Sequence, residues 1–187
     1  MRIIRGLYKG RKPAGTLPAH IRPTTDAVRE TVFNIIENYL TLDGAVVLDL
    51  FCGAGMFGIE ALSRGADKCF FIDKNFHSIE FVKKFILALK ITDEKYILQQ
   101  VDSEKFLKLS ATYFPGKYNL IFIDPPYNLL ISNKIIETID EQKLLSEKGI
   151  IVTEHSDFEV VIVPDNFEKI AERKQGSTVI DFLIIRK

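Results

Sequence analysis

Residues 46–58 read VVLDLFCGAGMFG, an apolar run that passes directly into a glycine-rich segment. The apolar run predicts a buried strand, and Gly53, Gly55 and Gly58 match the spacing Gly-x-Gly-x-x-Gly. Glycines at this spacing allow a tight turn from a strand into a helix and let a ligand approach the backbone closely. The segment therefore predicts a ligand-binding loop at the carboxyl end of a parallel strand.

The chain around this segment alternates apolar runs with amphipathic ones. Strands are expected at 45–50, 68–73, 96–101, 118–124 and 149–154, and helices at 56–64, 75–90, 103–112 and 132–145. Apolar strands that alternate with helices indicate an α/β fold with a mainly parallel sheet covered on both faces. Two further runs, 167–174 and 178–186, flank Gln175-Gly176 and predict an antiparallel C-terminal hairpin.

Three aspartates follow predicted strands and are candidate ligands of a nucleoside cofactor. The glycine pattern fits a dinucleotide or S-adenosylmethionine, but a carboxylate at Asp49 favours the donor with a cationic amino-acid part. The alternative is a buried aspartate that caps the turn. Asp73 is placed to bind a ribose diol. Asp102 could accept an adenine amino group, cap the next helix, or do both.

The second motif is Asp124-Pro125-Pro126-Tyr127 at the end of the fourth predicted strand. Two prolines stiffen the loop, so the Asp124 carboxylate and the Pro125 carbonyl form a pair of acceptors for an exocyclic NH2. Tyr127 offers a face on which a base can stack. Acceptors on both N–H groups raise the electron density of a poorly nucleophilic aromatic amine. A plain proline-rich turn is the alternative, which the glycine loop upstream disfavours.

Residues 1–25 contain six basic residues and no acidic one, although the whole chain has a formal net charge of zero. This composition predicts a basic arm (1–25), with the expected β-hairpin or extended form, ahead of the main domain (26–187). Candidate contacts with RNA phosphates are Arg5, Lys9, Arg11, Arg22 and Arg29. A solvated tail and a capping segment are the alternatives. A helix is expected after Pro23, capped by Thr24 or Thr25, and Thr24 could line the mouth of the site.

The remaining composition narrows the class of protein. Cys52 and Cys69 form no metal-binding pattern, so no metal site is expected. The chain has no apolar run of about 18 residues, so no membrane helix is expected. We expect a cytoplasmic monomer.

Four stretches together resemble the bacterial 16S rRNA guanine-N2 methyltransferase family: RIIRGLYKGRK (2–12), RPTTDAVRETVFN (22–34), DLFCGAGMFGIEALSRGA (49–66) and FIDPPY (122–127). The resemblance implies a Rossmann-like class I methyltransferase fold with a seven-stranded sheet and S-adenosylmethionine as donor. It implies the N2 of a guanine in small-subunit rRNA as acceptor, within an assembled or assembling subunit. It also implies that Asp49, Phe51, Gly53, Gly55 and Asp73 line the donor pocket and that residues 124–127 hold the base.

The sequence departs from the family at Cys52, Ala54 and Ala27, where alanine, serine and a basic residue are common. These departures concern one donor contact and one rRNA contact. Two alternative hypotheses use the same methyl-transfer chemistry, namely a DNA adenine-N6 methyltransferase and a protein glutamine methyltransferase. The former usually needs an added target-recognition region, and the latter usually has asparagine at the position of Asp124. A non-catalytic rRNA-binding assembly factor is the reading from another class.

Overall fold

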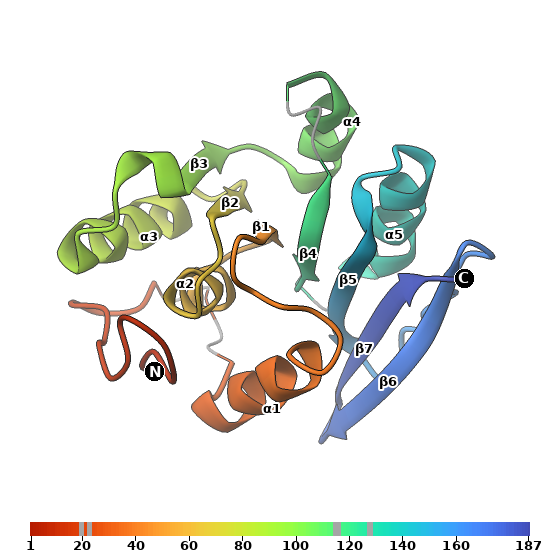
Figure 1. Ribbon diagram of the computed structural model, residues 1–187, viewed down its shortest axis with the longest axis horizontal. Coiled ribbons are helices and arrows are strands. Elements are labelled where there is room, and N and C mark those ends of the chain that lie inside the picture. The colour runs from red at the N-terminus through yellow and green to blue at the C-terminus, as the bar shows by residue number, and fades with distance from the viewer. Residues whose placement is uncertain (19–20, 22–23, 114–116, 127–128) are drawn as a thin grey trace.

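The computed structural model describes residues 1–18, 21, 24–113, 117–126 and 129–187. Its strands form one sheet in the order β3-β2-β1-β4-β5-β7-β6 (Figure 1). They are β1 (Val46–Leu50), β2 (Lys68–Asp73), β3 (Tyr96–Gln100), β4 (Tyr118–Ile123), β5 (Leu145–Ser156), β6 (Phe167–Gln175) and β7 (Thr178–Ile185). The first five strands pair in parallel, and β7 is antiparallel to both of its neighbours. The expected mainly parallel sheet with an antiparallel hairpin is confirmed.

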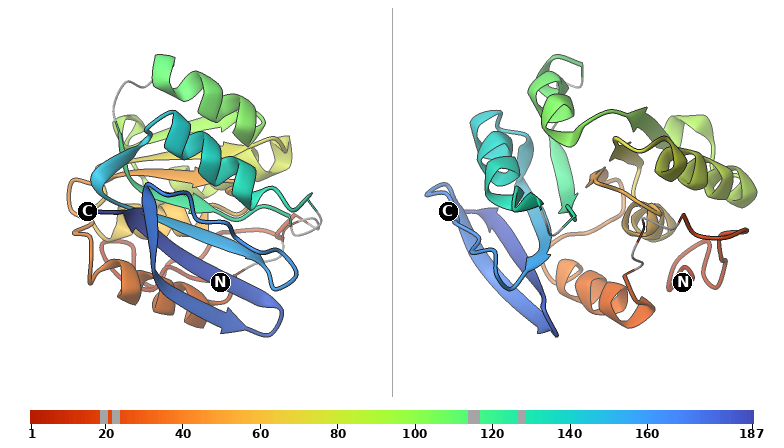
Figure 2. Two further views of the ribbon diagram at one scale, coloured as in Figure 1. Left: turned by 90° about the vertical axis from the view of Figure 1, so that its right-hand side faces the viewer. Right: turned by 180° about the vertical axis from the view of Figure 1, so that it is seen from behind.

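Helices cover both faces of the sheet. They are α1 (Asp26–Ile36), α2 (Met56–Ser63), α3 (Phe76–Leu89), α4 (Ser103–Tyr113) and α5 (Ser132–Glu141), with one 3-10 turn at Asp93–Lys95. Helices α1, α2 and α3 lie on one side and α4 and α5 on the other (Figures 1 and 2). The strand order reverses between β1 and β4, which is where open parallel sheets place their ligands.

Alternation along each strand divides the core into two layers. In β4, Leu120 and Phe122 belong to the layer under α1–α3, whereas Ile121 and Ile123 belong to the layer under α4 and α5. All four are at most 1% exposed, as expected for a strand covered on both sides. The same alternation determines on which face of the sheet a residue just beyond the end of a strand lies.

Helix boundaries follow their caps. Helix α1 begins after Thr25, whose side chain accepts a hydrogen bond from the backbone N–H of Val28, as expected for this cap. The expected helix at 132–145 is too long, because α5 ends at Glu141. Lys143 takes the left-handed conformation (φ 51°) that glycine usually supplies beyond a helix, so the sequence carries no stop signal there. Strand β5 then begins at Leu145, four residues earlier than expected.

The first residues form neither a helix nor a strand among those described, so the expected hairpin is absent there. Two backbone hydrogen bonds, from Ile3 N to Arg11 O and from Gly10 N to Ile3 O, close a loop instead. Ile3 is fully buried in the core layer under α1–α3. The arm therefore packs on the main domain. Among the described residues, no helix is both long and apolar enough to cross a bilayer.

Candidate functional site

A cavity of about 1140 Å³ lies at the carboxyl ends of the parallel strands, on the side covered by α1. Its floor comes from the loops after β1, β2 and β4 and from the end of β5, and its walls come from α1 and the β6–β7 hairpin. The lining includes Phe51, Cys52, Gly53, Ala54, Met56, Phe57, Asp73, Lys74, Asn75, Ser78, Asp124, Pro125, Pro126, Glu154, Arg173, Lys174, Gln175, Thr178 and Ile180, with Thr24, Ala27, Val28 and Thr31 from α1 and its approach. A smaller cavity of about 420 Å³ lies at the opposite ends of β4 and β5.

The glycine loop after β1 is a strained turn that opens onto the cavity. Phe51 is non-glycine yet has φ 57°, and Gly53 and Gly55 have φ 52° and 68°. The N–H of Gly55 donates to the Cys52 carbonyl over 2.6 Å, which closes the turn. Phe51 and Gly53 line the cavity, as the sequence predicts for the donor pocket.

The other two glycines of the motif serve packing. A Cβ on Gly55 would lie 2.7 Å from a methyl of Val82, and one on Gly58 would lie 2.4 Å from the Phe71 ring. These contacts bring α2 against β2 and α3, which aims the amino end of α2 at the loop. Gly55 is not among the residues that line the cavity, although its neighbours Ala54 and Met56 are, and its contact with the donor stays a prediction.

Asp49 lies beneath the loop. Its side chain is 2% exposed, and its Oδ2 accepts a hydrogen bond of 3.0 Å from the Gly58 N–H. Burial, together with the nearby charge of Asp73, raises its pKa to about 8, although the Gly58 N–H acts in the opposite direction. Asp49 does not line the cavity. This geometry is that of the capping alternative, and a direct contact of Asp49 with the donor stays a prediction.

Asp73 ends β2 and holds two backbone segments at the cavity. Its Oδ2 accepts from Gly53 N over 2.9 Å, and its Oδ1 accepts from Asn75 N over 2.8 Å. Asn75 in turn caps α3 by accepting from His77 N over 2.8 Å. Asp73 therefore orients the glycine loop and lines the cavity, where the sequence places a ribose ligand.

Asp102 lies outside the cavity lining. Its Oδ1 accepts hydrogen bonds from Glu104 N and Lys105 N at 3.1 and 3.2 Å, so it caps α4. The structure shows the helix cap, and an additional contact of Asp102 with an adenine amino group stays a prediction.

The acceptor loop after β4 brings Asp124, Pro125 and Pro126 to the same cavity as Gly53 and Asp73. Asp124 is half-buried, Pro125 is buried and Pro126 is exposed. Tyr127, the fourth predicted residue of this motif, lies outside the described residues. The two motifs, about 70 residues apart in the sequence, are joined because β1 and β4 are neighbours in the sheet.

Sequence reasoning missed the far wall of the cavity, which contains Glu154, Arg173, Lys174 and Thr178. Glu154 is the next residue on the cavity-facing side of β5 after Val152, so strand alternation could have indicated it. The hairpin residues could not be found in this way, because nothing local to β6 and β7 shows that the hairpin reaches the ends of β4 and β5. Thr24 lines the cavity, as the sequence predicts.

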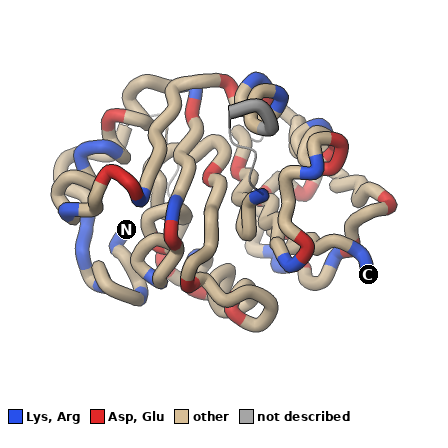
Figure 3. The backbone as a smooth tube through the Cα atoms, turned by 45° about the horizontal axis from the view of Figure 1, so that its top comes forward, with Lys and Arg blue, Asp and Glu red and all other residues tan. Residues whose placement is uncertain are grey.

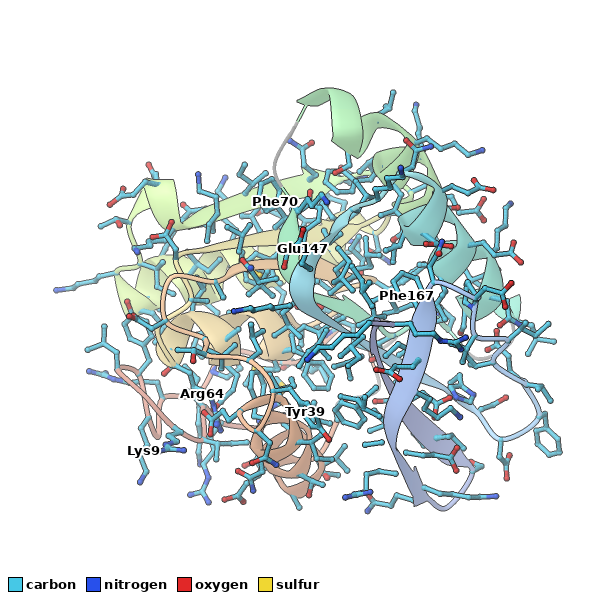
Figure 4. All side chains as sticks on the ribbon, turned by 45° about the vertical axis from the view of Figure 1, so that its right-hand side comes forward. Lys9, Tyr39, Arg64, Phe70, Glu147 and Phe167 are labelled. Atoms are coloured by element: carbon cyan, nitrogen blue, oxygen red, sulfur yellow. The ribbon has the colours of Figure 1, made fainter. Side chains whose placement is uncertain are left out.

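The candidate RNA-binding residues divide into two groups. Arg5, Lys9 and Arg11 are exposed on the arm, with Lys9 directed away from the rest of the molecule (Figure 4). Arg5 is 66% exposed and forms an ion pair of 3.0 Å with Glu37. Lysines and arginines also occur elsewhere on the surface (Figure 3). Arg22 lies outside the described residues.

The prediction for Arg29 is corrected by the structure. Its side chain is 0% exposed, and its guanidinium donates to the carbonyls of Thr24 and Arg2 at 2.8 and 2.6 Å and to Asp26 Oδ1 at 2.9 Å. A buried guanidinium with these partners has no access to a phosphate, so Arg29 ties the arm to α1. The sequence around Arg29 could not reveal this burial, because it depends on contacts with residues of the arm that are distant in the sequence.

The two cysteines are free and buried, and burial raises the pKa of both thiols well above the ordinary value. Cys52 nevertheless contributes to the lining of the cavity. Within the described part of the chain, no cluster of three or more His, Cys, Asp or Glu side chains could hold a metal ion.

Known proteins share both the sequence and the fold. A family model described as "Conserved hypothetical protein 95" matches residues 1–184. The chain is 38% identical over 187 residues to "Putative rRNA methyltransferase YlbH" of Bacillus subtilis, covering 100% of this chain and 99% of that protein. It is 32% identical over 179 residues to "Ribosomal RNA small subunit methyltransferase D" of Escherichia coli, covering 94% and 85%.

Solved structures agree on the fold. "Putative methyltransferase yhhF" from Escherichia coli superposes with a TM-score of 0.86 at 26% identity, covering 100% of this chain and 98% of that one. SMU.776, described as "a putative methyltransferase complexed with SAH", superposes with a TM-score of 0.68 at 17% identity, covering 84% of this chain and 48% of that one. This likeness concerns the fold alone. The expected Rossmann-like methyltransferase fold and the family resemblance are confirmed. The chain belongs to the Conserved hypothetical protein 95 family, that of ribosomal RNA small subunit methyltransferase D.

Proposed function

We propose that this protein transfers a methyl group from S-adenosylmethionine to the exocyclic N2 of a guanine in the 16S rRNA of the small ribosomal subunit. The observation that carries the proposal is the shared cavity, which is lined both by Gly53 and Asp73 and by Asp124-Pro125-Pro126. The names of the relatives, which specify rRNA of the small subunit, support the substrate class.

The residues at the ends of β1 and β2 fit the methyl donor. The backbone of Phe51 to Gly53, the Asp73 carboxylate and Ser78 line the cavity together, which suits a nucleoside with a ribose diol. When bound there, the donor supplies an electrophilic methyl group on a cationic sulfur. Asp49 acts indirectly in this proposal, by holding the loop through Gly58.

The acceptor loop performs the remaining chemistry. The Asp124 carboxylate and the Pro125 carbonyl accept hydrogen bonds from the two N2–H groups, which raises electron density on nitrogen and orients its lone pair. One N–H proton must leave during or after transfer, and Asp124 accepts it directly or through water. The target guanine must leave its stack to enter the cavity.

The test measures transfer of labelled methyl from S-adenosylmethionine to small subunits from cells that lack the enzyme, with naked 16S rRNA and DNA in parallel. Nucleoside analysis of the product should give N2-methylguanosine. N6-methyladenine in DNA would replace the proposed substrate, and no transfer to any acceptor would favour an assembly factor.

The same assay tests Asp124. We expect Asp124→Ala to bind S-adenosylmethionine as the wild type does and to lose at least about 100-fold in the rate of transfer, because one acceptor of the amine is removed. The control is Asp165→Asn, an exposed position in the β5–β6 loop. Loss of donor binding in a folded Asp124→Ala protein would contradict the role given to this carboxylate.

A further inference from the structure

A second carboxylate, that of Glu154, shares the cavity with Asp124. Strands β4 and β5 are parallel neighbours with Ile123 paired to Thr153, so Asp124 and Glu154 follow the last paired residues of adjacent strands. Adjacent strands lie about 4.8 Å apart. The two acids are thus brought side by side by the register.

Side-chain alternation places both acids on one face. Phe122 and Val152 belong to the core layer under α1–α3, and the residues two positions later, Asp124 and Glu154, continue that face into the cavity. On the other side, Glu154 is paired in register with Ile180 of β7, which is 4% exposed and also lines the cavity. Glu154 is therefore half-buried in a wall formed by three strands.

The strand order gives this wall a direction. The donor loop lies over β1 and β2, Asp124 follows β4, and Glu154 lies near the carboxyl end of β5, on the side of Asp124 away from the donor loop. Methyl transfer requires the amine nitrogen to face the donor, so the ring that carries the amine extends to the opposite side. Glu154 is placed where that ring must lie.

We propose that Glu154 is a specificity-determining residue that accepts a hydrogen bond from the N1–H of the target guanine. This inference rests on the proposed function. Guanine carries an N1–H donor beside its N2 amine, whereas adenine and cytosine carry a lone pair at the ring nitrogen beside theirs. A carboxylate attracts the former and repels the latter, so the acid that binds guanine also rejects the other amino bases. Arg173 and Lys174 line the same wall, and Lys174 forms an ion pair of 3.2 Å with Asp157.

The test uses 2-aminopurine, which keeps the 2-amino group of guanine but has a lone pair at N1. Small subunits would carry guanine, 2-aminopurine or adenine at the methylated position, introduced by ligation of a synthetic oligoribonucleotide. Initial rates of methyl transfer at limiting RNA give the selectivity, which is a ratio within one protein and is insensitive to the fraction folded. Glu154→Gln is the variant, and Glu147→Gln, exposed at the other end of β5, is the control (Figure 4).

We expect the wild type to prefer guanine to 2-aminopurine by about 100-fold or more, as for a site that pairs with a substrate N–H. In Glu154→Gln this preference should shrink at least about tenfold, because the amide can also donate to N1. Glu147→Gln should keep the wild-type ratio. An unchanged ratio in Glu154→Gln, or an equal loss on both bases, would overturn the inference while leaving guanine methylation intact. Failure of the wild type to methylate guanine would overturn the proposed function and this inference together.

Discussion

At the scale of single residues, Asp49 is the most unusual group of the site. A carboxylate that is 2% exposed beside a second acid is costly to ionise, and its pKa is raised to about 8 mainly by burial. Its hydrogen bond from Gly58 does not require a charge, because a neutral carboxyl or an amide oxygen accepts equally well in geometry. The glycine loop therefore depends on a hydrogen-bond acceptor at position 49 more than on a negative charge there.

This reasoning predicts the pH dependence of Asp49→Asn. Because the folded-state pKa of Asp49 is raised from 3.8 to about 8, its stabilising contribution is complete below the ordinary value and is lost as pH rises towards 8. The amide variant does not lose this contribution, so its free energy of unfolding relative to the wild type should increase between about pH 4 and pH 8. Urea unfolding at pH 5, 7 and 9 measures this difference. A difference that does not vary with pH would contradict the raised pKa.

At the scale of elements, the arm is a fixed attachment of α2. Glu60, which is fully buried, accepts hydrogen bonds from Ile4 N at 2.7 Å and Arg5 N at 3.0 Å. The Ser63 hydroxyl donates to the Arg5 carbonyl over 2.6 Å, and the Ser63 carbonyl accepts from Leu7 N over 2.7 Å. A Cβ on Gly6 would lie 1.7 Å from that carbonyl, so the close approach requires glycine. The backbone of the arm is held while its basic side chains remain exposed.

A held arm with exposed cations should contribute to RNA binding through charge. We expect the triple change of Arg5, Lys9 and Arg11 to glutamine to weaken binding to small-subunit rRNA. The slope of log affinity against log salt should fall by roughly 0.7 for each phosphate that the variant no longer neutralises. Titrations at several salt concentrations measure this slope.

The matched control for the arm replaces Lys117, Lys148 and Lys187 by glutamine, three exposed lysines away from the carboxyl ends of the parallel strands. The control variant loses three positive charges, as the arm variant does. Equal slopes for the arm variant and the control would show that the arm acts only through the overall charge of the protein.

At the scale of the whole molecule, a buried polar network joins the C-terminal strands that form the far wall. His155 of β5 contacts Asp181 Oδ2 of β7 at 3.2 Å and the Ser156 carbonyl at 2.9 Å, and Lys169 of β6 reaches Asp181 Oδ1 at 2.9 Å. Burial lowers the pKa of His155, but the hydrogen bonds and charge of Asp181 and the Ser156 carbonyl outweigh it, so the net shift is upward. The pKa of Asp181 is lowered in return, because its hydrogen bonds to His155 and Lys169 and their charges outweigh its own burial.

The shift predicts how stability varies with pH. Since the folded-state pKa of His155 is raised above 6.5, the stabilisation is complete below that value and is lost as pH rises through the raised pKa. His155→Gln should remove this component, so its free energy of unfolding should fall less than that of the wild type over this range. Denaturant unfolding from pH 5.5 to 8.5 measures both. Parallel pH profiles would mean that His155 does not titrate in this range.

The sequence by itself determined the parts whose cause is local. The period of the apolar residues predicted nearly every strand and helix, the glycine spacing predicted the turn after β1, and Asp124-Pro125-Pro126 predicted the acceptor loop. These features depend on neighbours along the chain, as does the Thr25 cap of α1. The family resemblance depends on the same segments, and the match of the family model to residues 1–184 confirmed it.

Only the tertiary structure decided which groups share space. It buried Arg29 against the arm, placed Asp49 beneath the loop, made Asp102 the cap of α4 and brought Glu154 beside Asp124 through the register of β4 and β5. Burial and charge depend on atoms distant in the sequence, and the free energy of a polar group is set by those atoms. A residue type in a motif therefore indicated which chemistry was possible, and packing decided which residues can perform it.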